Sequence, residues 1–221
     1  MSSLKVIALS LLALSAASVS SLQAQVIDGY PTQPIKLVVP FPPGGASDII
    51  ARIVGQRLAE RMKATVVIEN KAGANGNIAA EYVVRSKPDG YTLIYNSSSV
   101  ALSPALYKNL SFDVQKDLAP VVLTTVVPML LNVNNSVPAN NFQEFVALLK
   151  AKPDSLSYGS AGVGNITHLA PFLVLERLGL VANHVPYKGS GPAMIGLVGG
   201  EIQFDMQPIS VGLAYAKDGR V

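Results

Sequence analysis

Two segments of this sequence share one pattern, in which a short apolar strand is followed by a glycine-rich turn and then by a helix. The first runs from the strand Ile35–Val39 through Pro40–Gly45 to a helix over Ile49–Met62. The second runs from the strand Leu156–Tyr158 through another glycine-rich turn to a helix over Leu169–Leu178. Parallel strands joined by crossover helices produce this order, so the pattern predicts an α/β fold.

The same alternation continues along the rest of the chain. Further strands are predicted at Thr65–Glu69, Tyr91–Tyr95, Val121–Val127 and Met129–Val133, and further helices at Ile78–Arg85 and Phe142–Lys150. The turns that follow these strands are polar or rich in glycine. Ligands bind beyond the carboxyl ends of the strands in parallel α/β sheets, so these turns are the expected place for a site.

Composition excludes several classes of site. The chain has 221 residues and no cysteine, which excludes disulfides, thiolate zinc sites and cysteine nucleophiles. Its two histidines, His168 and His184, are too few for a histidine-based metal cage. The formal net charge of +3 is small and dispersed, so nucleic-acid binding is not expected. We therefore expect neither a metal nor a cofactor.

The first 24 residues have the organisation of a secretory signal peptide. Lys5 lies in a short basic segment, Val6–Ala17 is apolar, and small residues follow as far as Ala24. The apolar run is shorter than the roughly 20 residues that span a membrane, which favours cleavage over anchoring. A secreted chain without cysteine fits a bacterial periplasm better than a disulfide-dependent setting. The mature protein is expected to begin near Gln25.

Both glycine-rich turns lead into the first turn of a helix. The first four N–H groups of a helix have no partner within it, and the helix dipole is positive there, so these starts favour an anion. The polar residues also have purely structural readings. Asp48 favours the positive start of its helix, Ser160, Asn165 and Thr167 are cap candidates, and His168 fits a packed core position. A ligand site is favoured because both turns would face one cleft.

Five groups of residues, taken in chain order, carry a resemblance to a known family. They are Phe41-Pro42-Pro43-Gly44-Gly45 with Asp48 and Arg52; Asn70 with Gly73 and Gly76; Pro88-Asp89-Gly90-Tyr91-Thr92; Tyr158-Gly159-Ser160-Ala161-Gly162 with His168-Leu169; and Val185-Pro186-Tyr187-Lys188-Gly189 with Pro192-Ala193 and Gly199-Gly200. Each motif is weak alone, but together they cover nearly all of the chain after the signal peptide. They resemble the Bug family, the periplasmic substrate-binding proteins of tripartite tricarboxylate transporters.

This resemblance implies a two-lobed α/β fold of the periplasmic-binding-protein (Venus flytrap) type, which closes on a small carboxylate and performs no catalysis. It implies lobe 1 at residues 25–120, and lobe 2 at residues 121–221 together with the start of a crossover that returns to lobe 1. Family members usually continue further, so the chain is expected to be truncated at its C-terminus. The implied partners are a small carboxylate and the membrane components of a tripartite tricarboxylate transporter, and the protein is expected to be a monomer.

The candidate ligand-binding residues come from the two turns and from the polar loop after the third strand, together with one later acidic residue. They are Phe41, Gly44, Gly45, Ala46, Asp48, Ser97, Ser98, Ser160, Gly162, Asn165, Thr167, His168 and Asp205. The turns contain no evident buried arginine clamp, so recognition is expected through backbone amides, hydroxyls and water.

The alternative function is a secreted α/β hydrolase in which Ser160 is the nucleophile and His168 the base. The spacing Gly159-Ser160-Ala161-Gly162 does not match the G-x-S-x-G elbow of such enzymes. A dinucleotide site is disfavoured as well, because Gly162–Thr167 lacks the last glycine of G-x-G-x-x-G. A solute-binding function is therefore preferred.

Overall fold

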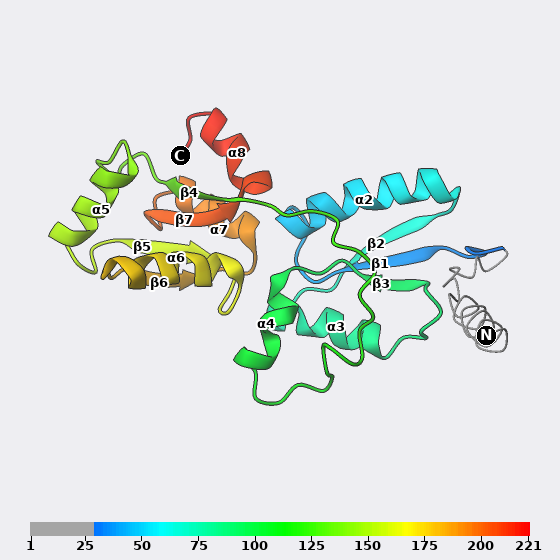
Figure 1. Ribbon diagram of the computed structural model, residues 1–221. Helices are drawn as coiled ribbons and strands as arrows, with labels where there is room; N and C mark the ends of the chain where they lie inside the picture. The colour runs from blue at the N-terminus through cyan, green and yellow to red at the C-terminus, as the bar shows by residue number, and fades with distance from the viewer. Residues whose placement is uncertain (1–28) are drawn as a thin grey trace, which may run out of the picture. The chain divides into compact units, whose positions relative to one another are not determined.

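The computed structural model describes residues 29–221 (Figure 1), and the expected signal peptide lies outside this range. Within it, the strands form two sheets, one in the order β2-β1-β3 and the other in the order β4-β7-β5-β6. We call the first sheet with its helices the first lobe and the second sheet with its helices the second lobe. Strands alternate with helices in both, which confirms the predicted α/β class.

The first lobe is a parallel sheet with helices on both faces. Its elements are β1 (Ile35–Val39), α2 (Ala46–Met62), β2 (Val66–Asn70), the 3-10 turn η2 (Ala74–Gly76), α3 (Asn77–Val84), β3 (Thr92–Ile94) and α4 (Ser98–Leu106). One apolar cluster joins α2 to the sheet through Ala51, Leu37 and Val39. A second cluster joins α3 and α4 to β3 on the other face, through Ala80 and Val100. All three carboxyl strand ends point to the same edge, because the strands are parallel.

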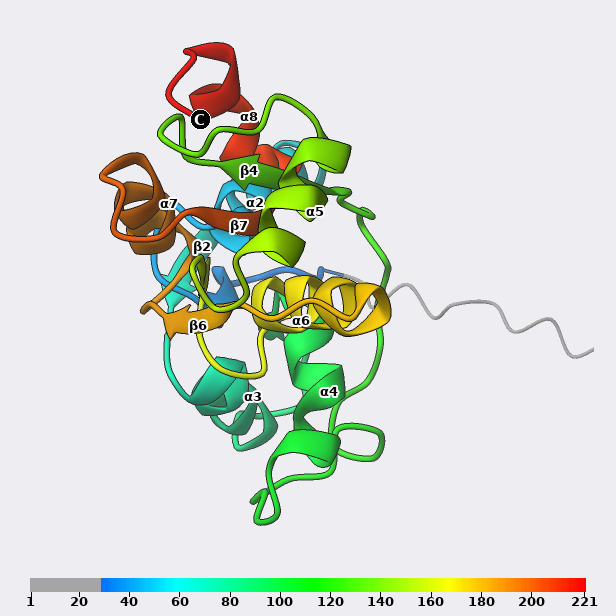
Figure 2. The same cartoon turned by 90° about the vertical axis from the view of Figure 1, so that its left-hand side faces the viewer.

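The second lobe also has three layers. Its elements are β4 (Met129–Val133), α5 (Phe142–Ala151), β5 (Ser157–Ser160), α6 (Ile166–Leu178), β6 (Asn183–Pro186), α7 (Ser190–Val198), β7 (Phe204–Pro208) and α8 (Ile209–Lys217). Helices α5 and α6 share one apolar cluster, and in Figure 2 they lie on the side of the sheet away from α7. Helices α7 and α8 share the cluster on the opposite face. Strand β4 pairs antiparallel with β7, an exception to the parallel pattern.

Two predictions of local structure are wrong. The apolar run Val121–Val127 forms no strand, and Leu123 and Val126 are each 80% exposed. Apolar composition favours a strand only where a neighbouring strand can complete its hydrogen bonds, and this segment instead connects β3 and its following helix to β4. The polar residues after β3 were expected to form a loop, but Ser97 caps α4 by accepting a hydrogen bond from the Ser99 N–H.

None of the helices within residues 29–221 has both the length and the apolar character that crossing a membrane requires.

Candidate functional site

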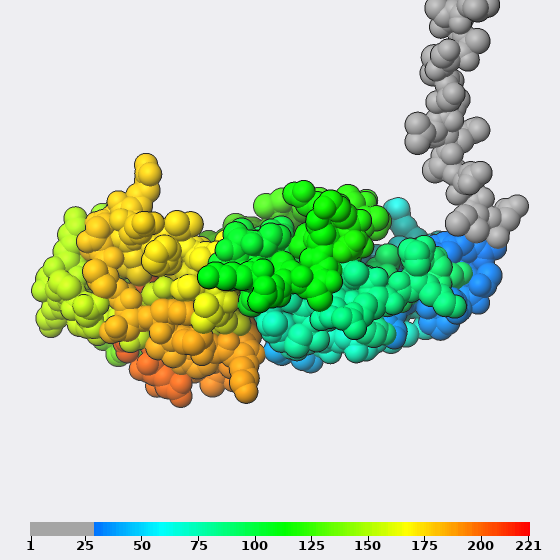
Figure 3. Space-filling view, turned by 90° about the horizontal axis from the view of Figure 1, so that it is seen from below, coloured from blue at the N-terminus to red at the C-terminus, as the bar shows by residue number. Residues whose placement is uncertain are grey.

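The turns that follow the parallel strands of the two lobes contact each other. A Cβ atom added to Gly189, in the turn after β6, would lie 3.3 Å from Pro42 Cδ in the turn after β1. The side-chain amide of Asn165, at the start of α6, donates to Ser99 Oγ at 3.1 Å and to Asn75 Oδ1 at 3.3 Å. Figure 3 shows the same meeting of surfaces, where the yellow turns of the second lobe reach the green surface of the α4 region. Residues far apart in the sequence are thus brought to one place.

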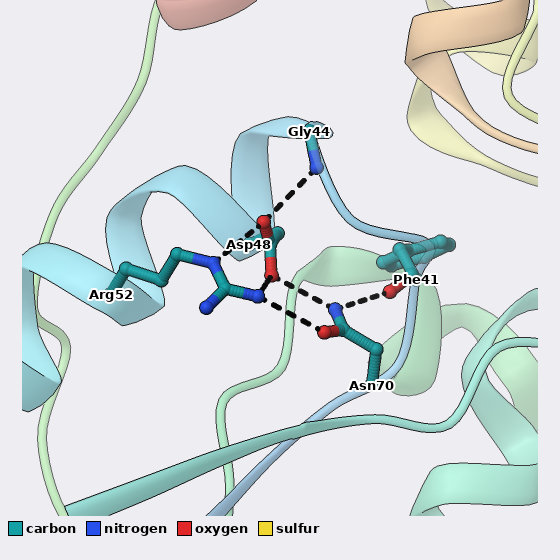
Figure 4. A network of polar contacts seen from close by, with 5 residues as sticks. All are labelled: Phe41, Gly44, Asp48, Arg52 and Asn70. Atoms are coloured by element: carbon teal, nitrogen blue, oxygen red, sulfur yellow. Dashed lines mark hydrogen bonds and ion pairs between the residues drawn. The ribbon is translucent and has the colours of Figure 1, made fainter.

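In the first lobe, the carboxylate of Asp48 organises the turn between β1 and α2 (Figure 4). It accepts hydrogen bonds from the Gly44 N–H at 3.0 Å, from Arg52 Nη2 at 2.9 Å and from Asn70 Nδ2 at 2.9 Å. The Asn70 amide also donates to the Phe41 carbonyl at 2.9 Å. Asp48 is only 3% exposed, so its oxygens are occupied by the protein itself. This geometry makes Asp48 a support for the turn.

The charge state of Asp48 follows from these partners. Burial alone would raise the pKa of the Asp48 carboxyl, but hydrogen bonds from Arg52, Gly44 and Asn70 outweigh it and bring the pKa below its usual value. Arg52 is correspondingly committed to Asp48, with its pKa raised by that hydrogen bond. The Arg52 guanidinium is therefore engaged by Asp48 and Asn70.

The start of α2 has no side-chain cap. Its N-cap residue, Gly45, makes no side-chain capping bond and has an extended backbone with φ of −80°. The next residue, Ala46, packs against the apolar cluster of α7 and α8 in the second lobe. The N-cap of α7, Gly189, likewise makes no side-chain capping bond. Two uncapped helix starts, one from each lobe, thus belong to turns that touch.

Gly189 needs its lack of a side chain for two reasons. Its φ is +117°, a backbone conformation that other residues rarely adopt. In addition, Pro42 of the first lobe occupies the space in which a Cβ would lie. This glycine was part of the sequence motif Tyr187-Lys188-Gly189, but it was not among the predicted site residues.

The glycine-rich turn of the second lobe differs from the first because its donors are already used. Four side chains accept backbone hydrogen bonds here: Ser160 Oγ from Gly162 N–H at 3.1 Å, Thr167 Oγ1 from Ala161 N–H at 2.7 Å, Asn165 Oδ1 from Thr167 N–H at 3.0 Å, and His168 Nδ1 from Gly164 N–H at 3.1 Å. The expectation that this turn offers free donors as the first one does is therefore not met. Its polar residues mainly hold the turn in shape.

Two first-lobe residues at the contact were missed by the sequence analysis. Ser99 is fully buried and accepts the bond from Asn165, whereas its neighbour Ser98 is exposed. Asn75 lies in the left-handed region with φ of +54°, and its buried Nδ2 has no hydrogen-bond partner. An asparagine in a Gly-Ala-Asn-Gly turn was the available signal, because asparagine tolerates that conformation best after glycine.

The last predicted site residue, Asp205, lies inside the second lobe. It is in β7, opposite Gly159 of β5, and is fully buried. Its two oxygens accept from Asn132 Nδ2 at 2.8 Å and from Gln207 Nε2 at 3.1 Å. Burial raises the pKa of the Asp205 carboxyl to about 6, although both amide donors act in the opposite direction. Asp205 is thus separate from the turns that carry most of the other candidates.

The hydrolase alternative requires Ser160 and His168 to meet, and they do not form the bonded pair. Ser160 Oγ lies 2.7 Å from Nε2 of His184, which was not among the predicted site residues. The serine is fully buried and its hydroxyl also lies 3.2 Å from the Gly162 carbonyl. Such a serine is not presented to a substrate.

Two further features of the described residues concern groups of metal ligands and surface hollows. Between residues 29 and 221, no three His, Asp or Glu side chains gather into a group that could hold a metal ion. Surface hollows beside α3 and near β1 are lined by first-lobe residues alone, so neither of these is a cleft shared by both lobes.

The contact through Asn165 allows a direct test of how strongly the two lobes are held together. Asn165→Asp keeps the acceptor that caps α6 but removes the donor to Ser99 and Asn75. We expect the free energy of unfolding to fall by about 1–3 kcal/mol, because the carboxylate oxygen that replaces the amide nitrogen carries charge into a buried position and faces the Asn75 Oδ1 acceptor. Ser99→Ala, which leaves the cap intact, serves as control, and the two effects should be non-additive in urea denaturation. Full additivity would show that the Asn165–Ser99 contact does not exist in solution.

Comparison with known proteins gives a consistent result for most of the chain. A sequence model described as tripartite tricarboxylate transporter family receptor matches residues 50–221. BugT of Bordetella pertussis is 35% identical over 196 residues, which cover 88% of this chain and 60% of BugT.

Two solved structures from Rhodopseudomonas palustris are similar in fold and sequence. Rpa4515, solved with adipate, is 33% identical with a TM-score of 0.84 and is matched over 86% of this chain and 64% of its own. MatC, solved with bound malate, is 31% identical with a TM-score of 0.76 and is matched over 86% of this chain and 65% of its own. The chain thus spans less than two thirds of the length of these relatives. None of these matches supports the hydrolase alternative.

Proposed function

This chain belongs to the tripartite tricarboxylate transporter family of receptors, and we propose that it captures a small carboxylate between its two lobes. The family match and the similarity to BugT confirm the resemblance to the Bug family. One observation carries the proposal: the uncapped starts of α2 and α7 come from different lobes, and their turns touch at Pro42 and Gly189. Such helix starts attract a carboxylate through free N–H groups and the helix dipole.

We assign the candidate residues different roles in this proposal. Direct contact falls to backbone groups of the first turn, namely Phe41, Gly44, Gly45 and Ala46, with Ser97 and Ser98 beside them. Asp48 acts through the turn that it holds. Ser160, Gly162, Asn165, Thr167 and His168 form the facing wall, which is shaped by its internal hydrogen bonds. Asp205 supports that wall from inside the second lobe.

The wider setting is also proposed. Lobe 1 corresponds to residues 25–120 and lobe 2 to residues 121–221, after removal of a signal peptide at residues 1–24. The protein works in the periplasm as a monomer and delivers its ligand to the membrane components of a tripartite tricarboxylate transporter. A dicarboxylate is the first ligand class to test, because Rpa4515 was solved with adipate and MatC with malate.

Thermal unfolding with matched ligands tests the proposal. Adipate or malate should raise the Tm, whereas adipamide, which has the shape of adipate without its charge, should not. A ligand at 100 times its Kd adds about 2.7 kcal/mol to the free energy of unfolding, which corresponds to a rise of roughly 5–10 °C for a chain of this length. A rise with adipamide equal to that with adipate, or no rise with any carboxylate of a broad panel, would refute capture of a carboxylate.

A substitution at Gly45 tests whether the ligand binds at the start of α2. A Cβ there would have only the Pro42 carbonyl oxygen nearby, at 3.6 Å, so Gly45→Val should fold while its side chain blocks the start of α2. We expect a tenfold or greater loss of affinity for the acid that raises the Tm, measured by calorimetry. Ala147→Val, on the exposed side of α5, is the control and should change neither affinity nor the heat of binding. Equal affinities in the two variants would place the ligand elsewhere.

A further inference from the structure

The two histidines of the chain lie against each other in the second lobe, although they are 16 positions apart in sequence. His168 comes from α6 and His184 from β6, and their rings stack with centroids 4.0 Å apart and planes 20° apart. Tyr158 of β5 stacks on His184 at 5.0 Å, and Phe172 of α6 lies 6.3 Å from His168. The pair therefore sits beneath the glycine-rich turn between β5 and α6.

His168 holds this turn through one nitrogen. Its Nδ1 accepts a hydrogen bond from the Gly164 N–H at 3.1 Å, so Nδ1 carries no proton in this arrangement. Protonation of the ring would place an N–H group directly against another N–H group. The bond to Gly164 would then be lost, and the turn would lose one of its attachments.

His184 holds the other end of the turn through Ser160. The Ser160 hydroxyl has one proton, which reaches either His184 Nε2 at 2.7 Å or the Gly162 carbonyl at 3.2 Å, and its oxygen accepts from the Gly162 N–H at 3.1 Å. When Nε2 is unprotonated, the hydroxyl donates to it. When the ring is charged, Nε2 donates instead and the hydroxyl proton must turn toward Gly162. Charge on either ring thus rearranges the bonds of the turn.

The surroundings favour the uncharged rings. Burial lowers the pKa of His168, and burial followed by the charge of neighbouring His168 lowers the pKa of His184 to about 4. Tyr158, which stacks on both rings, has its pKa raised by burial and stays neutral in acid. Each imidazole that gains a proton therefore opposes protonation of the other.

The turn is also where the second lobe meets the first. A Cβ at Gly164 would lie 2.7 Å from Leu106 Cδ1, and the adjacent Asn165 donates to Ser99. A change in the path of the turn would therefore reach the contact between the lobes.

We infer that His168 and His184 are positioning residues of the ligand site, which hold the Ser160–Gly164 turn while uncharged and release it in acid, so that ligand binding weakens. This inference rests on the proposed function only for its effect on affinity. Its effect on the turn can be measured without ligand.

The first measurement follows the ligand-free chain by NMR from pH 8 to pH 4. Because the chain contains two histidines, their ring nitrogens give two resolvable sets of signals. Both rings should titrate below the ordinary midpoint of about 6.5, and the amide signals of Gly162 and Gly164 should move with the same midpoints. The inference would be overturned if the rings titrated with the ordinary midpoint of a free histidine, or if the Gly162 and Gly164 amide signals did not move with the ring titration. This would hold even if the protein binds carboxylates well.

The second measurement compares adipate affinity at pH 4.0 and pH 7.5 in two proteins. The variant His168→Asn/His184→Gln keeps polar atoms near Nδ1 and Nε2 but gains no charge in this range. The wild-type affinity should fall at least about twofold more than the variant affinity between the two pH values, because roughly half of His184 is charged near its pKa. The comparison cancels titration of adipate and of Asp205, which both proteins share.

The two measurements separate the possible failures. Equal pH ratios in wild type and variant would overturn the positioning role. If the wild-type chain binds neither adipate nor malate at pH 7.5, these two acids are refuted as its ligands, and the ligand-free NMR titration alone decides whether the histidines hold the turn.

Discussion

Replacing Asp48 by alanine is expected to lower the free energy of unfolding by roughly 2–3 kcal/mol, because it removes a buried, charged acceptor from three partly buried hydrogen bonds. The Gly44 N–H and the Asn70 amide both lose this partner, and Arg52 loses its ion pair. Arg52 is about half exposed, with a side chain 52% accessible, so water compensates part of its loss. The value should be measured by urea denaturation at pH 7.

Affinity should fall together with stability in this variant, because the turn that Asp48 supports leads into the start of α2. The matched control is Glu60→Ala in the same helix, whose carboxylate pairs with Arg57 on the surface and should cost less than about 1 kcal/mol. If Asp48→Ala unfolds like the wild type but loses its ligand, Asp48 touches the ligand and our assignment of a supporting role is wrong.

Asp205→Asn is expected to change how stability depends on pH. The pKa of Asp205 rises from 3.8 to about 6 on folding, which corresponds to roughly 3 kcal/mol. Because the folded-state pKa is the higher one, the protonated carboxyl favours folding below pH 3.8, and this contribution is lost as the pH rises through 6. The free energy of unfolding of the wild type minus that of the variant should therefore fall by roughly 3 kcal/mol between pH 3.5 and pH 8.

This difference isolates Asp205, because both proteins share every other titrating group. The sign of the change with pH is the decisive feature. The absolute stability of the variant also depends on how an asparagine amide meets the Asn132 and Gln207 donors, both of which face this position. A difference that is constant from pH 3.5 to pH 8, or that rises with pH, would contradict a raised pKa for Asp205.

Local patterns predicted the strands well where burial and spacing agree. Ile35–Val39 and Met129–Val133 are strands with the predicted bounds. A short apolar run that ends at turn residues predicts a strand well when neighbouring strands complete its hydrogen bonds. Val121–Val127 has the same apolar character, but no neighbouring strand forms hydrogen bonds with it, so it is not a strand. The start of α4 was missed because serine favours both loops and helix caps.

The sequence by itself determined the α/β class and the two glycine-rich turns, and its motifs indicated the family, because these depend on local composition and order. Only the tertiary structure decided which donors remain free. Asp48 and Ser160 look alike in sequence, as polar residues in or just after a glycine-rich turn, yet they are bonded to partners 22 and 24 positions away, respectively. The close approach of Gly189 to Pro42 and the stacking of His168 on His184 could not be predicted from the sequence either. Hydrogen bonds and close packing depend on distances in space, which follow from how the sheets bring distant turns together rather than from the residues nearby in the chain.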